Sequence, residues 1–338
     1  MKKILVTGGA GYIGSHTILK LIEKDYSPVI LDDFSNSSLA VIERLERLSH
    51  QKISYLKGDV RDEDVLKTIF DKHPISAVIH FAGKKSVLES EINPLLYYSV
   101  NLGGSINLLR VMEEFGVKNL IFSSTATVYG NQKSEAYSET DPTNPINNYG
   151  KSKLAFEKIC EACSRCDDTW RFVMLRYFNP VGAHESGLIG EDPKGIPANL
   201  MPFISQVAIG KRACLKVFGN EYPTRDGTGA RDFIHVDDLA EGHIAALDAM
   251  LDNKLRPFEV FNLGTGDYTT VLELVKSFEE VNNVKVPINI VGKRAGDSAI
   301  CYSNPEKAKN VLGWIAKKTI KDMCKDTWNW QQKNPEGY

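Results

Sequence analysis

Short apolar runs alternate with amphipathic stretches along the first half of the chain. The amphipathic stretches carry apolar residues at helical spacing and predict helices over 13–24, 63–72, 93–115 and 149–165. The apolar runs predict buried parallel strands at 3–8, 27–33, 53–59, 76–83, 119–125 and 171–178. A strand followed by a helix, repeated in this way, predicts an α/β fold with a doubly wound parallel sheet.

The character of the sequence changes after "FNPVGAH" at 178–184, where loops rich in glycine, proline and asparagine replace the regular alternation. A chain of 338 residues is also long for one compact domain. We therefore expect a first domain over 1–180 and a smaller C-terminal domain over 181–338. The chain can cross back between the two beyond that boundary.

Composition and charge exclude several classes of protein. The 43 acidic and 41 basic residues leave a net charge of −2, which argues against binding to nucleic acid or to a membrane surface. The first apolar run is too short for a signal peptide, and no run is long enough to cross a membrane. We expect a cytoplasmic protein with reduced cysteines. Cys160, Cys163 and Cys166 lack the fourth ligand of a metal cluster, so no metal site is expected.

A glycine-rich turn joins the first predicted strand to the first predicted helix. In "VTGGAGYIGSH", Gly9, Gly11 and Gly14 match G-x-G-x-x-G, while Gly8, Gly11 and Gly14 match the related G-x-x-G-x-x-G. Glycine permits a tight turn and the close approach of a pyrophosphate, which the helix N-terminus attracts. In this strand–turn–helix context the motif predicts a Rossmann-type dinucleotide site in the first domain.

The ends of the next strands supply further candidates for this site. Asp32 closes the second strand, where its carboxylate can accept hydrogen bonds from a ribose and would repel a 2′-phosphate. No lysine or arginine lies between Asp32 and Arg44 to receive that phosphate, so NAD is favoured over NADP. Asp59 and Val60 follow the third strand, where an adenine would lie, and small residues within 80–86 follow the fourth.

A tyrosine and a lysine supply the candidate chemistry. In "NYGKSK", Tyr149 and Lys153 stand four positions apart on one face of the predicted helix. A phenol has an ordinary pKa of about 10. The ammonium and a positively charged nicotinamide would lower that pKa, so Tyr149 can take a proton from a substrate hydroxyl as hydride leaves the same carbon. Tyr129 and Lys133 match the same spacing, but turn residues surround them, and we expect Tyr129 to be structural.

A hydroxyl group is expected beside this pair to hold the reacting oxygen. The fifth strand ends with Ser123, Ser124 and Thr125. Thr125 stands at the strand end and is the predicted hydrogen-bonding residue, with Ser124 as its rival.

Together these motifs resemble the extended short-chain dehydrogenase/reductase family and, within it, the enzymes that epimerise UDP-hexoses. The resemblance covers essentially the whole chain and rests on "VTGGAGYIGSH", "VIHFAG", "FSSTATVYG", "NYGKSK", "LRYFNPVGAH", "NLMPFISQVA", "GTGARDFIHVDDLA" and "FNLGTG". It implies that UDP-glucose and UDP-galactose are interconverted with bound NAD. Sugar carbon 4 is oxidised transiently, the 4-keto intermediate rotates, and hydride returns to its other face.

The resemblance also implies which residues bind the cofactor and the substrate. The NAD-binding residues would be Gly8, Gly11, Tyr12, Ile13, Gly14, Asp32, Asp33, Phe34, Ser35, Asn36, Ser37, Asp59, Val60, Phe81, Ala82, Gly83, Lys85, Asn101, Tyr149, Lys153 and Phe178. The UDP-sugar would be bound, mostly in the C-terminal domain, by Thr125, Tyr149, Asn179, Asn199, Leu200, Lys216, Val217, Phe218, Arg231, Arg294, Asp297 and Cys301. A homodimer through the helices at 93–115 and 149–165 is implied as well.

Two positions depart from the family pattern. The family usually carries serine where this chain has Thr125, which keeps the hydroxyl but restricts its side-chain rotation. At the position of Cys301, family members with tyrosine are restricted to glucose and galactose. The smaller cysteine implies that UDP-N-acetylglucosamine and UDP-N-acetylgalactosamine are also interconverted, unless the neighbouring Tyr302 refills the space.

Two other functions remain as alternatives. A nucleotide-sugar 4,6-dehydratase shares the fold, the cofactor and the first oxidation, but needs an acid–base pair directly after the threonine. This chain has Ala126 and Thr127 there. A non-catalytic NAD-sensing module would have no reason to retain Tyr149, Lys153 and the hydroxyl of Thr125 together.

Overall fold

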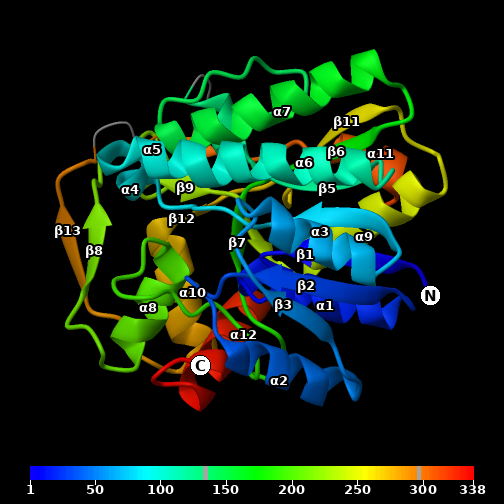
Figure 1. The fold of residues 1–338 in the computed structure, drawn as a ribbon. Helices are drawn as coiled ribbons and strands as arrows, with labels where there is room; N and C mark the ends of the chain where they lie inside the picture. The colour runs from blue at the N-terminus through cyan, green and yellow to red at the C-terminus, as the bar shows by residue number, and fades with distance from the viewer. Residues whose placement is uncertain (132–135, 295–297) are drawn as a thin grey trace. The chain divides into compact units, whose positions relative to one another are not determined.

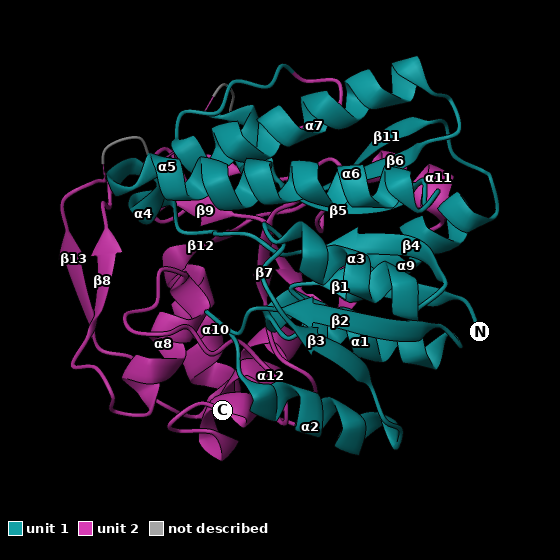
Figure 2. Cartoon of the chain, in the orientation of Figure 1, with its two compact units in different colours: residues 1–130, 142–176, 240–261 teal, residues 131–141, 177–239, 262–338 magenta. Residues whose placement is uncertain are grey.

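The computed structural model describes residues 1–131, 136–294 and 298–338, and its chain divides into two compact units (Figure 2). Unit 1 comprises residues 1–130, 142–176 and 240–261. Unit 2 comprises residues 131–141, 177–239 and 262–338. The chain therefore returns to the first unit for one late segment before it ends in the second.

Unit 1 is built on a seven-stranded sheet in the order β11-β6-β5-β4-β1-β2-β3 (Figure 1). Its strands are β1 Lys3–Thr7, β2 Ser27–Asp32, β3 Ser54–Lys57, β4 Ile75–His80, β5 Asn119–Thr125, β6 Arg171–Tyr177 and β11 Phe258–Leu263. The pairs β1–β2, β1–β4, β2–β3 and β4–β5 are parallel. Because β2 and β4 lie on opposite sides of β1, the winding reverses there, which is where doubly wound sheets bind ligands.

All six predicted strands are present, with two differences from expectation. The strand β3 is not buried, because it forms the edge of the sheet and has a neighbour on one side only. The strand β11 was not predicted. It belongs to the late segment that returns to unit 1, where it follows the helix α9 Val236–Leu251.

Helices cover both sides of this sheet (Figure 1). The helices α1 Tyr12–Glu23 and α2 Leu39–Ser49 contact each other on one side, and α3 Glu63–Lys72, α6 Ser105–Glu114 and α7 Asn148–Cys166 lie on the other. The single helix predicted over 93–115 is three segments: α5 Pro94–Tyr97, the π-helix η1 Tyr98–Gly104, and α6. Two short elements complete the unit, α4 Val87–Ile92 and the 3₁₀ helix η2 Ala126–Tyr129.

The core of unit 1 fixes α7 against the sheet. Phe122 on β5, Phe156 on α7 and Phe172 on β6 are fully buried, and the rings of Phe122 and Phe156 meet edge to face, 4.7 Å between centroids. The first turn of α7 is capped by Asn147, whose side-chain oxygen accepts a hydrogen bond from the Gly150 amide at 2.8 Å. The apolar pattern and the cap together explain why α7 begins beside the end of β5.

Unit 2 has its own core and smaller sheets. β7 Asn179–Val181 pairs in parallel with β10 Phe233–His235, and β8 Leu215–Phe218 pairs in parallel with β13 Ile288–Val291. A three-stranded sheet has the order β12 Thr269–Thr270, β9 Ala230–Arg231 and β14 Ile300–Cys301. The remaining helices are α8 Leu200–Ala208, α10 Val271–Asn282, α11 Glu306–Leu312 and α12 Ile320–Lys333. Fully buried side chains such as Ile204, Leu274 and Phe278 form its core.

Candidate active site

The end of β5 and the first turns of α7 bring the predicted catalytic residues together. Lys153 is 4% exposed, and its ammonium donates a hydrogen bond to the Ser123 carbonyl at 2.9 Å. The same ammonium lies 4.7 Å from the centroid of the Phe122 ring. Burial lowers the pKa of Lys153 to about 8, because the charged form loses hydration.

The pKa of the Tyr149 phenol depends mainly on its burial. Burial raises the pKa of Tyr149, and the hydrogen bond with the Thr125 hydroxyl lowers it by less. Among the protein's own residues desolvation dominates, so the pKa of this phenol is raised; the lowering predicted from the sequence depends on a positively charged nicotinamide as well as on the Lys153 ammonium. A phenolate at neutral pH needs a further positive charge near the ring.

The two rival hydroxyls at the strand end have different partners. The Thr125 hydroxyl donates to the Thr127 hydroxyl at 2.9 Å and accepts from the Thr127 amide at 3.1 Å, and it also forms a hydrogen bond with Tyr149. Ser124 is fully buried and donates to the carboxylate of Glu157. The hydroxyl of Thr125 is thus the one that meets the tyrosine, while the hydroxyl of Ser124 is used inside the protein.

Tyr129, the rival tyrosine, lies at the end of η2 with no exposed surface. Its hydroxyl accepts a hydrogen bond from Arg176 at 3.1 Å, and the guanidinium lies 5.0 Å from the ring centroid. These contacts fit a structural residue. The other member of its pair, Lys133, lies outside the described residues.

The glycine turn forms a tight bend at the start of α1. Gly8 has φ +69°, and a side-chain carbon there would come within 2.7 Å of the Ala82 backbone nitrogen. A side-chain carbon on Gly14 would collide with the carbonyl of Gly8. Gly11 is the N-cap of α1, no side chain caps that end, and its first turn carries no acidic residue. The backbone amides of Tyr12 and Ile13 in this first turn therefore suit an anion.

Asp32 lies at the end of β2, beside the turn. Its carboxylate accepts hydrogen bonds from the Ala10 amide at 3.0 Å, the Phe34 amide at 2.9 Å and the Ser37 hydroxyl at 2.8 Å. Burial raises the pKa of Asp32, and these three donors oppose that rise. A carboxylate has about four acceptor positions, so capacity remains for one ribose hydroxyl.

The other loop residues predicted to bind NAD follow Asp32 directly. Asp33, Phe34, Ser35 and Asn36 form the connection from β2 to α2, in which the Ser35 amide bonds to the Asp33 carboxylate at 2.8 Å. Phe34 has φ +57°, a left-handed conformation that reverses the chain there.

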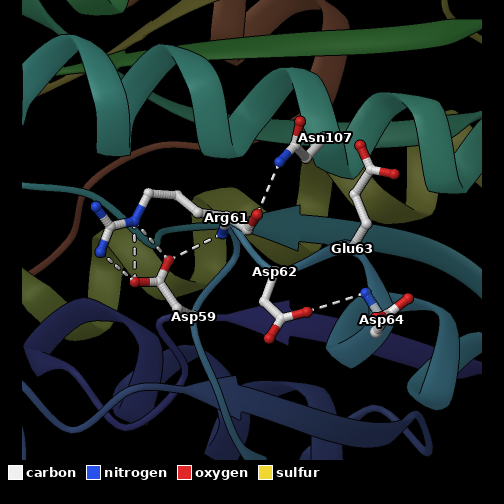
Figure 3. Close-up of a pocket in the computed structure, with 6 residues that line it drawn as sticks. All are labelled: Asp59, Arg61, Asp62, Glu63, Asp64 and Asn107. Carbon is white, nitrogen blue, oxygen red and sulfur yellow. Dashed lines mark hydrogen bonds and ion pairs between the residues drawn. The ribbon is translucent and has the colours of Figure 1, made fainter.

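Asp59 and Val60 follow β3 and have different surroundings. Val60 is buried against Gly104 of the π-helix. The carboxylate of Asp59 is paired with Arg61, whose Nη2 lies 2.6 Å away, and this pair lowers the pKa of Asp59 (Figure 3). Any contact of Asp59 with a ligand must share this carboxylate with Arg61.

A shallow hollow surrounds that pair (Figure 3). Most of its polar groups bond to one another: Asn107 donates to the Arg61 carbonyl at 2.8 Å, and the Asp64 amide donates to Asp62 at 3.0 Å. The lining residues are Asp59, Arg61, Asp62, Glu63, Asp64 and Asn107. The hollow thus includes Asp59, the residue predicted to lie beside the adenine.

The loop after β4 is held by Asn101 of the π-helix. The side chain of Asn101 accepts from the Lys84 amide at 2.7 Å and donates to the Lys84 carbonyl at 3.0 Å. It also donates to the Ser152 hydroxyl at 3.1 Å, which in turn donates to the Tyr149 carbonyl at 2.7 Å. Asn101 therefore connects the loop containing Phe81, Ala82, Gly83 and Lys85 to the first turns of α7.

His80 ends β4 inside a second buried network whose proton positions can be deduced. Ser105 must donate to the Asn101 carbonyl at 2.6 Å, so at 2.8 Å its oxygen accepts from Nε2 of His80. Nδ1 of His80 then accepts from the Thr7 hydroxyl at 2.6 Å. His80 is thus a neutral imidazole with its proton on Nε2. Burial and the nearby Lys153 charge lower the pKa of His80 to about 3.

Apart from Thr125 and Tyr149, the predicted substrate residues belong to unit 2. Asn179 begins β7, Asn199 is the N-cap of α8, Leu200 is the first residue of that helix, and Lys216, Val217 and Phe218 lie in β8. The guanidinium of Arg294 lies 3.6 Å from the centroid of the Phe218 ring. Phe178, the one predicted NAD contact in this unit, is buried and its amide bonds to the Leu263 carbonyl at 3.2 Å.

Arg231 and Cys301 are register partners on the adjacent strands β9 and β14. Arg231 donates to the Ala230 and Ser298 carbonyls at 2.8 and 3.0 Å, which holds its guanidinium in place. Burial raises the pKa of Cys301 to about 11, so it is a neutral thiol. Asp297 lies outside the described residues.

Sequence reasoning missed two residues next to the site. Glu157 and Arg176 form a buried ion pair, 2.6 Å between Nη2 and Oε2, at the end of β6 and on α7. The available signal was the spacing, since Glu157 stands four positions after Lys153 on the helix face that carries Tyr149. Over the described ranges, no group of three or more histidine, cysteine or acidic residues could hold a metal ion.

The glycine turn, the acidic end of β2 and the threonine–tyrosine–lysine group define a dinucleotide-dependent short-chain dehydrogenase/reductase of the extended type. The family model described as GDP-mannose 4,6 dehydratase matches residues 5–327.

Individual relatives give a narrower assignment. UDP-glucose 4-epimerase 2 of Arabidopsis thaliana is 52% identical over 340 residues, covering 100% of this chain and 97% of that protein. The crystal structure of UDP-glucose 4-epimerase from Bifidobacterium longum in complex with NAD+ and UDP has a TM-score of 0.95 at 47% identity, and each chain covers 100% of the other. The structure of the Stenotrophomonas maltophila enzyme, with bound NAD and formylated UDP-arabinopyranose, has a TM-score of 0.97 at 45% identity, covering 99% of each chain. The chain therefore belongs to the UDP-glucose 4-epimerase family.

The tautomer of His80 can be tested directly. We expect the ¹⁵N shifts of labelled histidine to show a neutral ring protonated on Nε2 down to pH 5, because the folded pKa is about 3. Between pH 7 and pH 5 His80 becomes protonated in the unfolded chain but stays neutral in the folded chain. Folding stability therefore falls as the pH falls. His80→Gln, which cannot titrate, should lose about 2 kcal/mol less stability than wild type over that range in urea unfolding. A ring protonated on Nδ1, or charged at pH 6, would contradict the deduced network.

Proposed function

We propose that this protein interconverts UDP-glucose and UDP-galactose with NAD as a resident cofactor. The observation that carries the proposal is the contact of Thr125 with Tyr149 beside the buried Lys153, on a chain about half identical to epimerases along its whole length. Incubation with UDP-galactose and identification of the product tests it. Recovery of UDP-galactose unchanged would refute it.

The residues of unit 1 fit NAD. The bend at Gly8 and the uncapped start of α1 leave backbone amides available to a pyrophosphate, and Asp32 can accept a ribose hydroxyl. Lys153, with Gly83 nearby, would bind the nicotinamide ribose, as the family resemblance implies. When bound, NAD supplies the acceptor and donor of hydride and a positive charge in its oxidised form.

The protein's own residues have distinct tasks in this proposal. Tyr149 removes the proton of the sugar 4-hydroxyl and later returns it. The hydrogen bond between Thr125 and Tyr149 favours the ionised phenol, and Lys153 adds positive charge on the same helix face. Burial disfavours both charged side chains, so neighbouring charges determine when the phenol ionises.

The residues of unit 2 are proposed to bind the UDP-sugar. Arginine suits a diphosphate because its planar guanidinium can form two parallel hydrogen bonds, and Arg231 and Arg294 are both held in place by neighbouring groups. Asn179, Asn199 and the strand β8 supply amide and backbone groups that can bind a uracil, a ribose or hydroxyls of the sugar.

The two alternatives have less support. A 4,6-dehydratase needs an acid–base pair after the threonine, and Ala126 and Thr127 stand there with Thr127 bonded to Thr125. A module that only senses NAD would not need the threonine–tyrosine contact. The named relatives on which the assignment rests are epimerases.

The width of the substrate range is a further part of the proposal. Cys301 places a thiol where the restricted family members carry a phenol, which leaves volume for an acetamido group. Tyr302, the residue that could refill this volume, packs its ring against Tyr268 with 5.4 Å between centroids. The buried carboxylate of Asp232 accepts from the Ser303 amide at 3.1 Å and its hydroxyl at 2.6 Å, which fixes the chain just beyond. We infer that N-acetylated UDP-hexosamines are also substrates.

Assembly and location complete the proposal. Leu88, Ile92 and Leu95 on α4 and α5 are 70%, 85% and 81% exposed, and a surface this apolar supports the homodimer. The α4 and α5 segments contact α7, one of the helices through which family members pair. The six free thiols agree with a reducing, cytoplasmic location. No helix in the described ranges is long and apolar enough to span a membrane.

The first prediction of this proposal concerns Tyr149. Tyr149→Phe removes one oxygen atom and should lower kcat by about 10²-fold to 10⁴-fold, the usual contribution of a general base. The folded structure and the NAD content should be unchanged, as measured by thermal unfolding and by absorbance of the released cofactor. Full turnover in this variant would eliminate Tyr149 as the base.

A second prediction separates the hydroxyl of Thr125 from its shape. Thr125→Ser keeps the hydroxyl and should retain kcat within about 3-fold, whereas Thr125→Val keeps the shape and should lose about 10-fold or more, because a donor to the reacting oxygen is gone. Steady-state rates with UDP-galactose compare the two. Equal rates in the valine variant and the wild type would remove this role from Thr125.

A third prediction addresses Cys301. Cys301→Tyr should abolish conversion of UDP-N-acetylgalactosamine and preserve conversion of UDP-galactose, because the ring occupies the space of the acetamido group. Cys301→Ser is the matched control and should retain both activities. Product analysis with each sugar nucleotide measures the effect. A wild-type protein that converts only UDP-galactose would exclude the wider range.

A further inference from the structure

Three successive residues at the end of β5 each contact a different residue of α7, and these three helix residues are spaced four positions apart. The Ser123 carbonyl accepts from Lys153, the Ser124 hydroxyl donates to Glu157, and Thr125 bonds Tyr149. Tyr149, Lys153 and Glu157 share one face of the helix because residues four apart are neighbours on its surface. Tyr149, Lys153 and Thr125 have tasks in the proposed reaction, whereas Glu157 has none.

Glu157 is held more tightly than a surface carboxylate would be. It is 2% exposed, and its Oε1 accepts from both the Ser124 hydroxyl and Nε of Arg176, the latter at 3.0 Å. Its Oε2 accepts from Nη2 of Arg176 at 2.6 Å. This two-point contact has a fixed geometry because both groups are planar. Arg176 is itself fixed, since its Nη1 donates to the Tyr129 hydroxyl at 3.1 Å.

The network therefore joins four elements of unit 1. Glu157 lies on α7, Ser124 on β5, Arg176 on β6 and Tyr129 on η2. A buried ion pair adds little net stability compared with apolar residues of similar size, because both charges lose their hydration. Its geometry, by contrast, tolerates little sliding or rotation of α7.

The packing at the start of α7 makes that position consequential. A side-chain carbon at Gly150 would lie 3.0 Å from Cγ2 of Thr127 and 3.1 Å from the Thr127 carbonyl, so the helix touches the residues just after β5. One residue of α-helix corresponds to about 1.5 Å of rise and about 100° of rotation. A shift of α7 by a fraction of a residue is enough to break the contact between Tyr149 and Thr125.

We propose that Glu157, clamped by Arg176 and bonded to Ser124, is a positioning residue that sets the placement of Tyr149 against Thr125. The inference rests on the proposed epimerase function. It assigns Glu157 no contact with the sugar or the cofactor. It also gives Ser124 a role. Its hydrogen bond to Glu157 holds α7 against the end of β5, one residue before Thr125.

Ser124→Ala and Glu157→Gln test this role without emptying the core. Ser124→Ala removes one hydrogen bond, and Glu157→Gln keeps the shape but weakens both the ion pair and the bond to Ser124. The matched control is Ser164→Ala, also on α7, where a buried hydroxyl donates to the Glu161 carbonyl at 2.9 Å. For each variant we would measure kcat and KM for UDP-galactose, the retained NAD, and the melting temperature.

We expect kcat to fall about 10-fold in Ser124→Ala and about 10-fold to 100-fold in Glu157→Gln, because misplaced groups react slowly even when both are present. KM and retained NAD should change less than about 2-fold, and Ser164→Ala should match wild type. The acid limb of the pH–rate profile should move to higher pH in both variants, since loss of the Thr125 hydrogen bond raises the pKa of Tyr149. If the ion pair were purely structural, weakening it would lower the melting temperature and leave the acid limb of the pH–rate profile unchanged.

The double variant Ser124→Ala/Glu157→Gln separates an indirect role of Ser124 from a direct one. If Ser124 acts through Glu157, the double variant should be no slower than Glu157→Gln alone. If the losses of kcat in the two single variants multiply in the double variant, Ser124 contacts the reacting groups itself. That result would overturn this part of the proposal.

A final variant covers the case in which Glu157→Gln does not fold, because it leaves Arg176 buried without its full partner. Glu157→Gln/Arg176→Gln removes both charges and should fold with the same loss of kcat. A kcat equal to that of the wild type, in this double variant or in Glu157→Gln alone, would overturn the positioning role of Glu157. The proposed function would still stand. A wild-type protein that leaves UDP-galactose unchanged would overturn both.

Discussion

The packing of α7 against the end of β5 is the constraint on which the rest of unit 1 depends. The two elements carry the threonine, tyrosine and lysine of the candidate site, and neither element alone brings them together. Aromatic packing between Phe122 and Phe156 sets the distance between helix and sheet, while Lys153 and Glu157 bond to successive residues of the strand end. The polar bonds are directional, so they determine the rotation of the helix that the apolar core leaves free.

The electrostatics of the site follow from this burial. Burial favours the neutral forms of both a phenol and an amine, which raises the pKa of Tyr149 and lowers the pKa of Lys153 to about 8. His80, fully buried nearby, stays neutral and adds no competing charge. The site therefore has few fixed charges of its own near the phenol. Its protonation state is then sensitive to any charged group that binds beside it.

The candidate substrate-binding residues of unit 2 are held in place in a different way. Its substrate-binding candidates lie on short strands and a helix start, and backbone bonds and a buried carboxylate hold them in place. Asp232 is fully buried and accepts hydrogen bonds from Thr265, Gly266 and Ser303, which ties β9 to the segment after β14. Burial raises the pKa of Asp232, and these donors oppose the rise. Arg231 and Cys301 are thereby fixed next to each other on adjacent strands.

The sequence by itself determined the elements of unit 1 and the identity of the candidate groups, because these depend on local patterns. Six strands, the helices α1, α3 and α7 and the glycine turn follow from hydrophobic period and from residues with special backbone requirements. The sequence missed β11, the exposed position of β3 and the π-helix within 93–115, since strand order and neighbouring contacts decide them. It did not show that burial raises the pKa of Tyr149, because spacing along a helix shows which groups are neighbours but not how much water they lose. Only the tertiary structure decided that Ser124 bonds Glu157 while Thr125 meets Tyr149, since burial and direction distinguish two adjacent hydroxyls that the sequence leaves equivalent.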